Sequence, residues 1–215
     1  MSDLSARRLE EKDRRRAEIL DAAEAVADEL GIDALTMDQV AKRARISRAL
    51  LYVYFQDRDD LHLGLCERGL ALMTTRFEQA ARRHPTGLAQ IRAIGAAYVA
   101  FAQKFPVYFE ALARFHASET DPDQAGNIAQ CMAAGERVQL IMIGALEAGQ
   151  RDGSISKRAG NPAAIAMTLW GFMYGVIQLS ITKSVVLSRY GLSGRKLFEQ
   201  ALHLATRSLA AIDRA

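Results

Sequence analysis

Apolar side chains recur at helical spacing along most of the 215-residue chain, and strict alternation of apolar and polar residues never exceeds a few positions. The first clear stripe consists of Ile19, Ala23, Val26 and Leu30. Residues spaced in this way lie on one face of an α-helix. We therefore predict an all-α protein of about nine helices, over residues 10–30, 37–44, 48–54, 58–83, 87–104, 107–117, 122–151, 162–189 and 194–211.

Residues that favour helix ends stand at the boundaries of these segments. Thr36 and Gln39 have the spacing of a capping box, in which two free backbone N–H groups are satisfied reciprocally. Glycine, which ends many helices in a left-handed conformation, is found at positions 31 and 191. Other residues of the N-cap type are Ser47, Asp57, Asp121 and Asn161, the last two each followed by proline.

The two short predicted helices, 37–44 and 48–54, are separated by about three residues and flanked by longer ones. This order is typical of a helix-turn-helix. We predict an N-terminal arm and helix-turn-helix domain of three helices over residues 1–57. A second helical domain is expected over residues 58–215, with 58–83 as the connecting helix.

The net charge of +3 is too small to indicate a nucleic-acid partner. Residues 1–65 even carry more acids (14) than cations (11). The 18 residues from Gln39 to Gln56, however, contain four cations and no acid: Lys42, Arg43, Arg45 and Arg48. Because cations displace the counterions of DNA phosphates, this local pattern indicates a DNA-facing surface.

The second short helix is expected to enter the major groove of DNA, with its N-terminal residues nearest the bases. The fork of Arg48 matches the two acceptors of guanine. Ala49 is small enough for close approach to DNA. Leu50 is expected to face outward, where it can contact thymine methyl groups.

The stretch from Thr36 to Leu61 resembles the TetR family of transcriptional regulators, and the resemblance extends over the whole chain. It is carried by Ser47, Leu51-Tyr52, Tyr54-Phe55 and Arg58. The resemblance implies phosphate contacts from Thr36, Ser47, Tyr52, Tyr54 and Arg58. The family usually has glycine where Arg45 stands, so this cation is expected in the turn, and Leu50 replaces a small or hydroxylated residue.

Aromatic and thioether side chains gather in the second domain. Such side chains suit an adaptable cavity for an apolar ligand, and the family resemblance implies a small-molecule inducer there. The predicted lining is Tyr98, Phe101, Phe105, Phe109, Met132, Met167, Trp170, Met173 and Tyr174.

Residues 159–182 carry no charge and are long enough to span a bilayer. They include a small-xxx-small pair that permits close helix approach. The resemblance implies instead that the last two long helices form a four-helix bundle across a two-fold axis. The predicted dimer interface is Gly171, Gly175, Gln178, Leu197, Ala201 and Leu204.

We find no catalytic, metal-binding or cofactor-binding motif in the sequence, so we predict that the protein is not an enzyme. Its charged start does not read as a signal peptide, and two distant cysteines suit the cytoplasm. The predicted function is a homodimeric repressor that binds a palindromic DNA operator and is released by an apolar inducer. The alternatives are a membrane-associated protein anchored by 159–182 and a DNA-binding repressor without an inducer.

Overall fold

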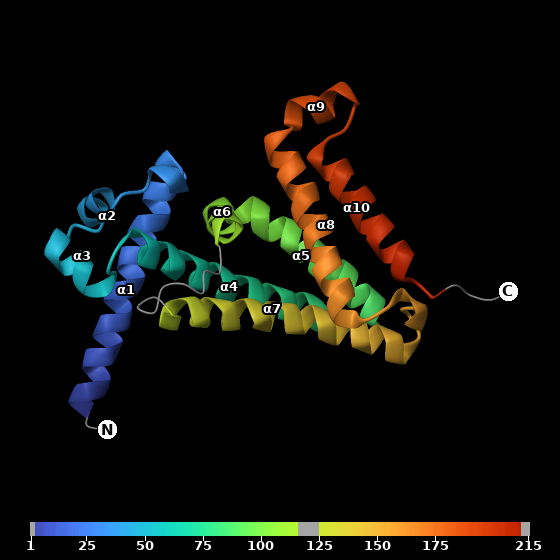
Figure 1. Cartoon of the computed structure of the whole chain (residues 1–215), viewed down its shortest axis with the longest axis horizontal. Helices are drawn as coiled ribbons and strands as arrows, with labels where there is room; N and C mark the ends of the chain where they lie inside the picture. The colour runs from blue at the N-terminus through green and yellow to red at the C-terminus, as the bar shows by residue number, and fades with distance from the viewer. Residues whose placement is uncertain (1–2, 116–124, 212–215) are drawn as a thin grey trace. The chain divides into compact units, whose positions relative to one another are not determined.

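A computed structural model describes residues 3–115 and 125–211, and within these ranges the regular elements are all helices (Figure 1). The predicted all-α class is confirmed. The α-helices are α1 (Asp3–Leu30), α2 (Met37–Arg43), α3 (Arg48–Tyr54), α4 (Arg58–Arg82), α5 (Gly87–Lys104), α6 (Pro106–Arg114), α7 (Ala125–Asp152), α8 (Pro162–Thr182), α9 (Ser184–Arg189) and α10 (Gly194–Leu209). Two short 3₁₀ helices are η1 (Ile32–Ala34) and η2 (Lys157–Ala159).

The first helix is longer than predicted, because it begins at Asp3 rather than residue 10. Residues 7–14 are exposed and lack an apolar stripe, which is why hydrophobic spacing missed the start of the helix. Ion pairs between neighbouring turns follow within the predicted range: Arg14 contacts Glu11 at 2.6 Å and Arg15 contacts Glu18 at 2.6 Å. Such pairs stabilise an exposed helix.

The predicted helix 162–189 is broken in two, which gives ten α-helices in the described ranges instead of about nine. Lys183 leaves the helical conformation, with φ of −124° and ψ of 28°, and α9 begins at the next residue. No glycine or proline marks this break in the sequence. The predicted end of helix 107–117 and the predicted start at Asp121-Pro122 lie outside the described residues.

The other predicted helix caps are confirmed. The Asp60 N–H donates to the Asp57 carboxylate at 2.8 Å, and the Ala163 N–H donates to the Asn161 side-chain oxygen at 2.9 Å. Gly31 and Gly191 have left-handed φ angles of 85° and 67°. These caps fix where α4 and α8 begin and where the chain leaves α1 and α9.

The chain forms two compact units, which we call the N-terminal unit (residues 1–70 and 105–133) and the C-terminal unit (71–104 and 134–215). The boundary between them falls within α4, so both units share this helix. The N-terminal unit includes α6 and the start of α7 as well as the helix-turn-helix. This division follows packing, and the functional domain boundary at residue 57 stays a prediction.

The core of the N-terminal unit forms where α2 and α3 pack beside α1 (Figure 1). The inner face of α1 is buried, whereas Leu30, the last residue of the predicted stripe, is exposed where the helix ends. The buried side chains that join these helices are Ile19, Ala23, Val26, Val40, Ala41, Leu51 and Phe55. Within this small core α2 contacts both α1 and α3, so it connects α3 to the long first helix.

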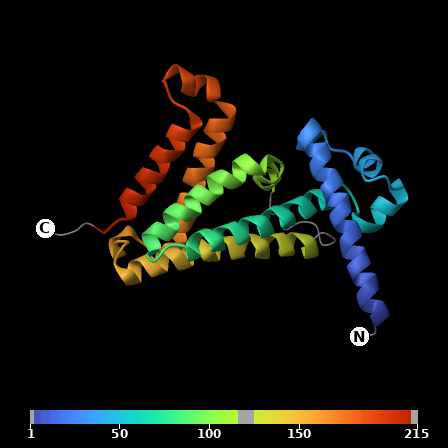
Figure 2. The ribbon, with the colours of Figure 1, turned by 180° about the vertical axis from the view of Figure 1, so that it is seen from behind.

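In the C-terminal unit, α8 and α10 lie side by side and both contact α5 (Figure 2). The end of α7 packs closely on the start of α5, and the Gly87 N–H donates to the Asp152 carboxylate at 2.8 Å. The end of α10 is tied back to the segment before η2, because the Ser156 N–H donates to Leu209 O at 2.9 Å. These contacts fix the end of α7 on α5 and the end of α10 beside the segment that leads into α8.

Candidate DNA-reading helix-turn-helix

The first helix of the motif begins with the predicted capping box. The Gln39 N–H donates to the Thr36 hydroxyl at 3.4 Å, and the Thr36 N–H donates to the Gln39 side-chain oxygen at 2.9 Å. Thr36 therefore has a structural role at the start of α2. Its side chain is exposed and therefore accessible to DNA. The phosphate contact itself stays a prediction.

The turn between α2 and α3 closes through a left-handed residue. Arg45 has a φ of 56°, and within the described residues it is the one non-glycine position with a positive φ. The Arg45 N–H donates to Lys42 O at 3.2 Å, and the Ile46 N–H donates to Ala41 O at 3.0 Å. These two bonds form a Schellman motif, which usually has glycine at the position of Arg45. The cation is thus placed in the turn at a cost in backbone strain.

Ser47 is the N-cap of the second helix, α3, as predicted. Its hydroxyl oxygen accepts a hydrogen bond from the Leu50 N–H at 3.1 Å. A serine hydroxyl has one proton to donate as well as two acceptor sites. Capping therefore leaves the O–H of Ser47 available for a phosphate oxygen.

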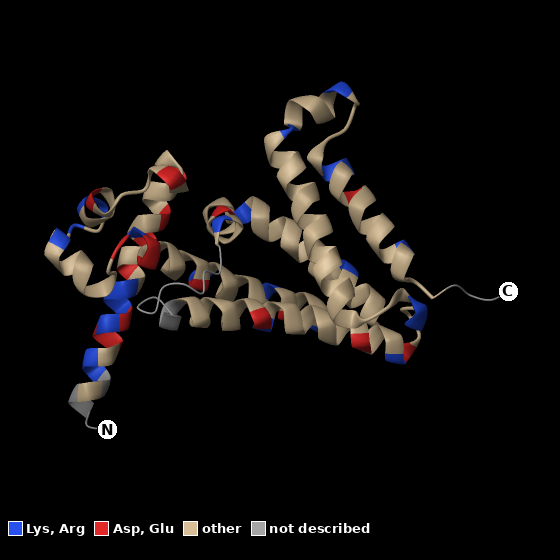
Figure 3. Cartoon of the chain, in the orientation of Figure 1, with Lys and Arg blue, Asp and Glu red and all other residues tan. Residues whose placement is uncertain are grey.

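The outer face of α3 contains most of the predicted DNA-binding residues. Arg48, Ala49, Leu50 and Tyr52 are exposed, and Tyr54 is half-buried. Sequence reasoning missed Val53, whose side chain is 71% exposed and lies one helical turn after Ala49. The i, i+4 spacing of these two residues was the available signal. Figure 3 shows basic residues on α2 and at the start of α3.

A second missed residue is Asp38, in the first turn of α2. Its Oδ1 lies 2.6 Å from Nε of Arg48, and both side chains are mostly exposed. The Tyr52 hydroxyl, as a hydrogen-bond partner, and the charge of Asp38 raise the pKa of Arg48 above its ordinary value. The guanidinium predicted to read guanine thus contacts a carboxylate of the other helix in the motif.

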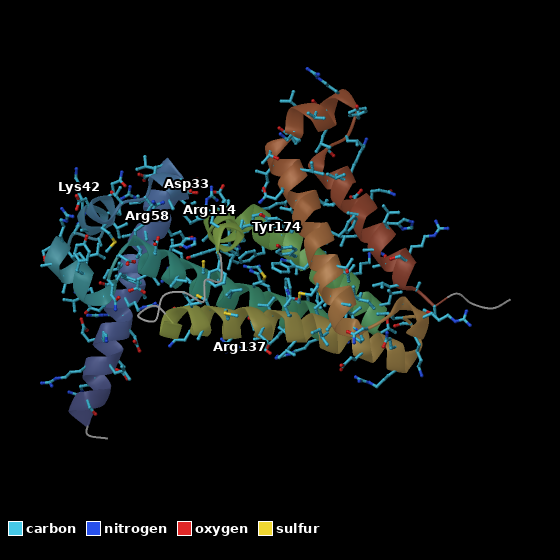
Figure 4. All side chains as sticks on the ribbon, viewed as in Figure 1. Asp33, Lys42, Arg58, Arg114, Arg137 and Tyr174 are labelled. Atoms are coloured by element: carbon cyan, nitrogen blue, oxygen red, sulfur yellow. The ribbon has the colours of Figure 1, made fainter. Side chains whose placement is uncertain are left out.

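Arg58 binds the backbone of its own unit. Its Nη2 donates to Asp33 O at 2.9 Å and to Ile32 O at 3.2 Å, which ties the start of α4 to η1 (Figure 4). Arg58 is also exposed, so the phosphate contact implied for it stays a prediction. A guanidinium has five N–H donors, and these two bonds do not use them all.

The nine predicted ligand-lining residues are divided between the units. Tyr98, Phe101 and Met173 are buried in the C-terminal unit, Tyr174 is half-buried, and Met167 and Trp170 are exposed. Burial raises the pKa of Tyr98 to about 12, and the nearby Trp170 side chain opposes this rise. In the N-terminal unit, Phe109 is buried, Phe105 is half-buried and Met132 is exposed.

A pocket of about 170 Å³ lies in the N-terminal unit, between the end of α1 and the start of α6. None of the nine predicted residues lines it. Its lining is Ala27, Asp28, Gly31, Ile32, Pro106, Val107 and Glu110. This volume is below the usual range for small-molecule sites. The predicted ligand site therefore stays a prediction.

The predicted dimer residues differ in their exposure within one chain. Gly171 and Leu204 are exposed, Gly175, Gln178 and Leu197 are half-buried, and Ala201 is buried inside the C-terminal unit. A side chain added at Gly171 or Gly175 would meet no atom within 4 Å. The α8–α10 region also presents large exposed apolar side chains: Met167, Trp170, Phe172, Leu179, Ile181 and Leu204. In the described residues, α8 is the one helix long and apolar enough to cross a membrane.

Comparison with known proteins agrees with this geometry. Residues 19–65 match the family model of bacterial regulatory proteins of the tetR family, and residues 91–205 match the tetracyclin repressor-like C-terminal domain. A helix-turn-helix with this C-terminal domain defines a DNA-binding transcriptional regulator, a class of proteins that are not enzymes. The chain belongs to the TetR family.

Two curated relatives are similar to part of the chain. One is the HTH-type transcriptional activator FasR of Mycolicibacterium smegmatis, 30% identical over 92 residues, which are 43% of this chain and 42% of the relative. The other is the HTH-type transcriptional regulator BetI of Burkholderia cenocepacia, 38% identical over 86 residues, which are 39% of this chain and 43% of the relative. The match thus spans about two fifths of each relative's length.

Likeness over the whole chain comes from solved structures. A protein with unknown function from Rhodococcus sp. RHA1 is similar with a TM-score of 0.74 and 23% identity, over 91% of this chain and 95% of that one. At this identity the likeness shows a shared fold. It supports the all-α architecture of the chain and says nothing about its ligand.

Proposed function

We propose that the protein is a homodimeric, ligand-responsive transcriptional repressor that binds a palindromic operator through α2 and α3. The observation that carries this proposal is the exposed face of α3, with Arg48 at its N-terminal end and apolar or aromatic side chains after it. An N-terminal arginine on such a helix is in the position from which recognition helices contact base edges.

Reading of guanine by Arg48 is the most specific part of the proposal. One bidentate contact with the O6 and N7 acceptors of guanine contributes about 1–3 kcal/mol of discrimination. Contacts from Thr36, Ser47, Tyr52, Tyr54 and Arg58 to phosphates would fix the register of the helix without selecting a sequence.

The test is to select an operator from a random duplex library with the purified protein and then to measure binding of Arg48→Ala. We expect the Arg48→Ala variant to lose about 1–3 kcal/mol of binding free energy on the operator and much less on random DNA. Lys42→Ala is the matched control, because it removes an exposed cation from α2 and should weaken both duplexes alike. An equal loss of Arg48→Ala on both duplexes would leave Arg48 with only a phosphate role.

Dimerisation is proposed through the exposed apolar residues of α8 and α10. Open space at Gly171 and Gly175 allows close approach of a partner helix. A two-fold symmetric dimer presents two copies of α3, and protein symmetry of this kind is mirrored in a palindromic operator. We expect this regulator to work in the cytoplasm, where the DNA is.

An apolar inducer is proposed to bind the C-terminal unit near Tyr98, Trp170, Met173 and Tyr174. It can release DNA only if it binds more tightly to a conformation that fits the operator poorly. A ligand that binds the folded protein must raise its thermal stability. A screen of apolar compounds by thermal shift therefore separates this proposal from a repressor without an inducer.

One observation favours a different candidate function. The apolar length of α8 also fits a membrane-associated protein anchored by residues 159–182. Recovery of the full chain in the soluble fraction without detergent would exclude the anchor. Recovery only with detergent would exclude the dimer proposed through α8.

A further inference from the structure

The ion pair between Asp38 and Arg48 lies at the surface of the helix-turn-helix. Asp38 is in the first turn of α2 and Arg48 is the first residue of α3, and the side chains are 60% and 62% exposed. An exposed ion pair contributes little to folding stability. Its geometry therefore bears more on what Arg48 presents to DNA than on the stability of the fold.

The atom that Asp38 contacts determines which edge of Arg48 remains open. Asp38 Oδ1 lies 2.6 Å from Nε of the guanidinium. The two terminal nitrogens, Nη1 and Nη2, form the other edge of the fork. That edge matches the paired O6 and N7 acceptors of guanine. A carboxylate at Nε is thus compatible with an end-on contact between Arg48 and a base.

The pair also restricts the motion of a long side chain. An arginine held in place before binding loses less conformational freedom when it meets its target. The restraint comes from the other helix of the motif, because Asp38 is in the first turn of α2 and its Oδ1 lies 2.6 Å from Nε of Arg48.

The charge of Asp38 acts in the opposite direction on DNA without a preferred sequence. A carboxylate beside the DNA-facing surface repels phosphates and partly neutralises Arg48, so it weakens binding that depends on charge alone. A residue with these two effects lowers affinity for random DNA and orients the group that selects a base.

We propose that Asp38 is a positioning residue that determines specificity, by holding the guanidinium of Arg48 for an end-on contact with guanine. This inference rests on the proposed base-reading role of Arg48. It adds that the selectivity of the recognition helix depends on an acidic residue of the other helix in the motif.

The experiment measures the binding of the full-length wild-type protein and of its Asp38→Asn variant to three duplexes. These are the selected operator, the same operator with the contacted guanine replaced by adenine, and random DNA. We expect Asp38→Asn to reduce the preference for guanine over adenine by about 3- to 10-fold, a part of the full bidentate effect. Binding to random DNA should stay equal or increase, because a negative charge is lost. A merely structural role of Asp38 would not change the preference at one base pair.

Glu29→Gln is the matched control, since it breaks the exposed ion pair between Glu29 and Arg43 in the same unit. We expect this variant to keep the guanine preference of the wild-type protein. A double-mutant cycle gives a second measurement: in an Arg48→Ala background, Asp38→Asn should cause no further loss of preference.

The outcomes distinguish this inference from the proposed function. If Arg48→Ala removes the guanine preference and Asp38→Asn keeps it, Asp38 has no positioning role and the reading by Arg48 stands. If Asp38→Asn strengthens operator binding and keeps the preference, Asp38 only masks Arg48 and the inference is overturned. If the wild-type protein shows no guanine preference that depends on Arg48, both the base-reading role and the inference fail.

Discussion

The guanidinium of Arg114 donates two hydrogen bonds to the carboxylate of Asp33, from Nε to Oδ1 at 2.9 Å and from Nη2 to Oδ2 at 2.8 Å (Figure 4). Arg114 is the last residue of α6 and Asp33 lies in η1, directly after α1. The guanidinium of Arg58 donates hydrogen bonds to the backbone carbonyl groups of the same turn. The η1 turn is therefore connected to both α4 and α6.

This ion pair predicts a specific response to acid. The hydrogen bonds from Arg114 lower the pKa of Asp33 below its ordinary value of 3.8. A carboxylate with a lowered pKa in the folded state stabilises the fold above its unfolded-state pKa, and this contribution is lost as the pH falls through the folded-state value. The advantage of the wild-type protein over Asp33→Asn in urea unfolding should therefore be constant above about pH 5 and shrink below about pH 4. Asp13→Asn, on the exposed start of α1, is the control, and an advantage that grows in acid would contradict this prediction.

The left-handed turn at Arg45 predicts a conflict between stability and DNA binding. Arg45→Gly should raise the free energy of unfolding by about 1 kcal/mol relative to Arg45→Ala, because only glycine has the φ of 56° without strain. Both variants lose the cation and should bind DNA more weakly than the wild-type protein, to the same extent. Urea denaturation and binding to random DNA test the two halves of the prediction. Equal stability of the two variants would show that the turn is not strained.

The contact between the start of α5 and the end of α7 predicts a strong sensitivity at Gly87. A methyl group there would lie 2.1 Å from the backbone nitrogen of Gly149, and backbone cannot give way as a flexible side chain can. We expect Gly87→Ala to destabilise the protein by about 3 kcal/mol in urea denaturation. Gly144→Ala, on an exposed position of α7, should instead stabilise it by about 0.5–1 kcal/mol. A loss of stability well below this value in Gly87→Ala would mean that α5 and α7 leave room for a methyl group at this contact.

The open space at Gly171 and Gly175 makes the proposed dimer testable without unfolding the chain. A Cβ added at either position meets no atom of its own chain within 4 Å, so the variant with leucine at both positions should keep its thermal stability as a monomer. It should nevertheless lose dimerisation, because the bulky side chains prevent close approach of the partner helix. Light scattering measures the mass, and Gly144→Leu on α7 is the control that should remain dimeric. A double variant that is still dimeric would place the interface elsewhere.

The sequence predicted helices and their ends well where local chemistry determines them. The capping box of Thr36 and Gln39, the Ser47 cap and the glycine at position 31 each act within a few residues, so their signals are visible in a short stretch of sequence. The start of α1 was missed because the residues there form no apolar stripe. The break at Lys183 has no local signal in the sequence.

Contacts between distant segments could not be predicted in this way. In the sequence Asp38 is simply the residue before the basic stretch of Gln39 to Gln56, and its contact with Arg48 depends on how α3 packs on α2. The same holds for Gly87, which is close to Gly149 only in the folded chain. Residue type predicted which groups would be chemically suited to DNA, and packing decides which of them are oriented by a neighbour.

Trp170 is the single tryptophan of the chain, and it stands on α8 with about half of its surface exposed. Its side chain lies near the buried Tyr98 hydroxyl and is partly open to solvent. Tryptophan fluorescence therefore comes from one known place in the molecule. Covering of α8 by a partner should shift the emission to shorter wavelength, and a compound that binds beside Trp170 and Tyr98 should change its intensity. The protein thus contains its own optical reporter for both events, and neither measurement needs an attached dye.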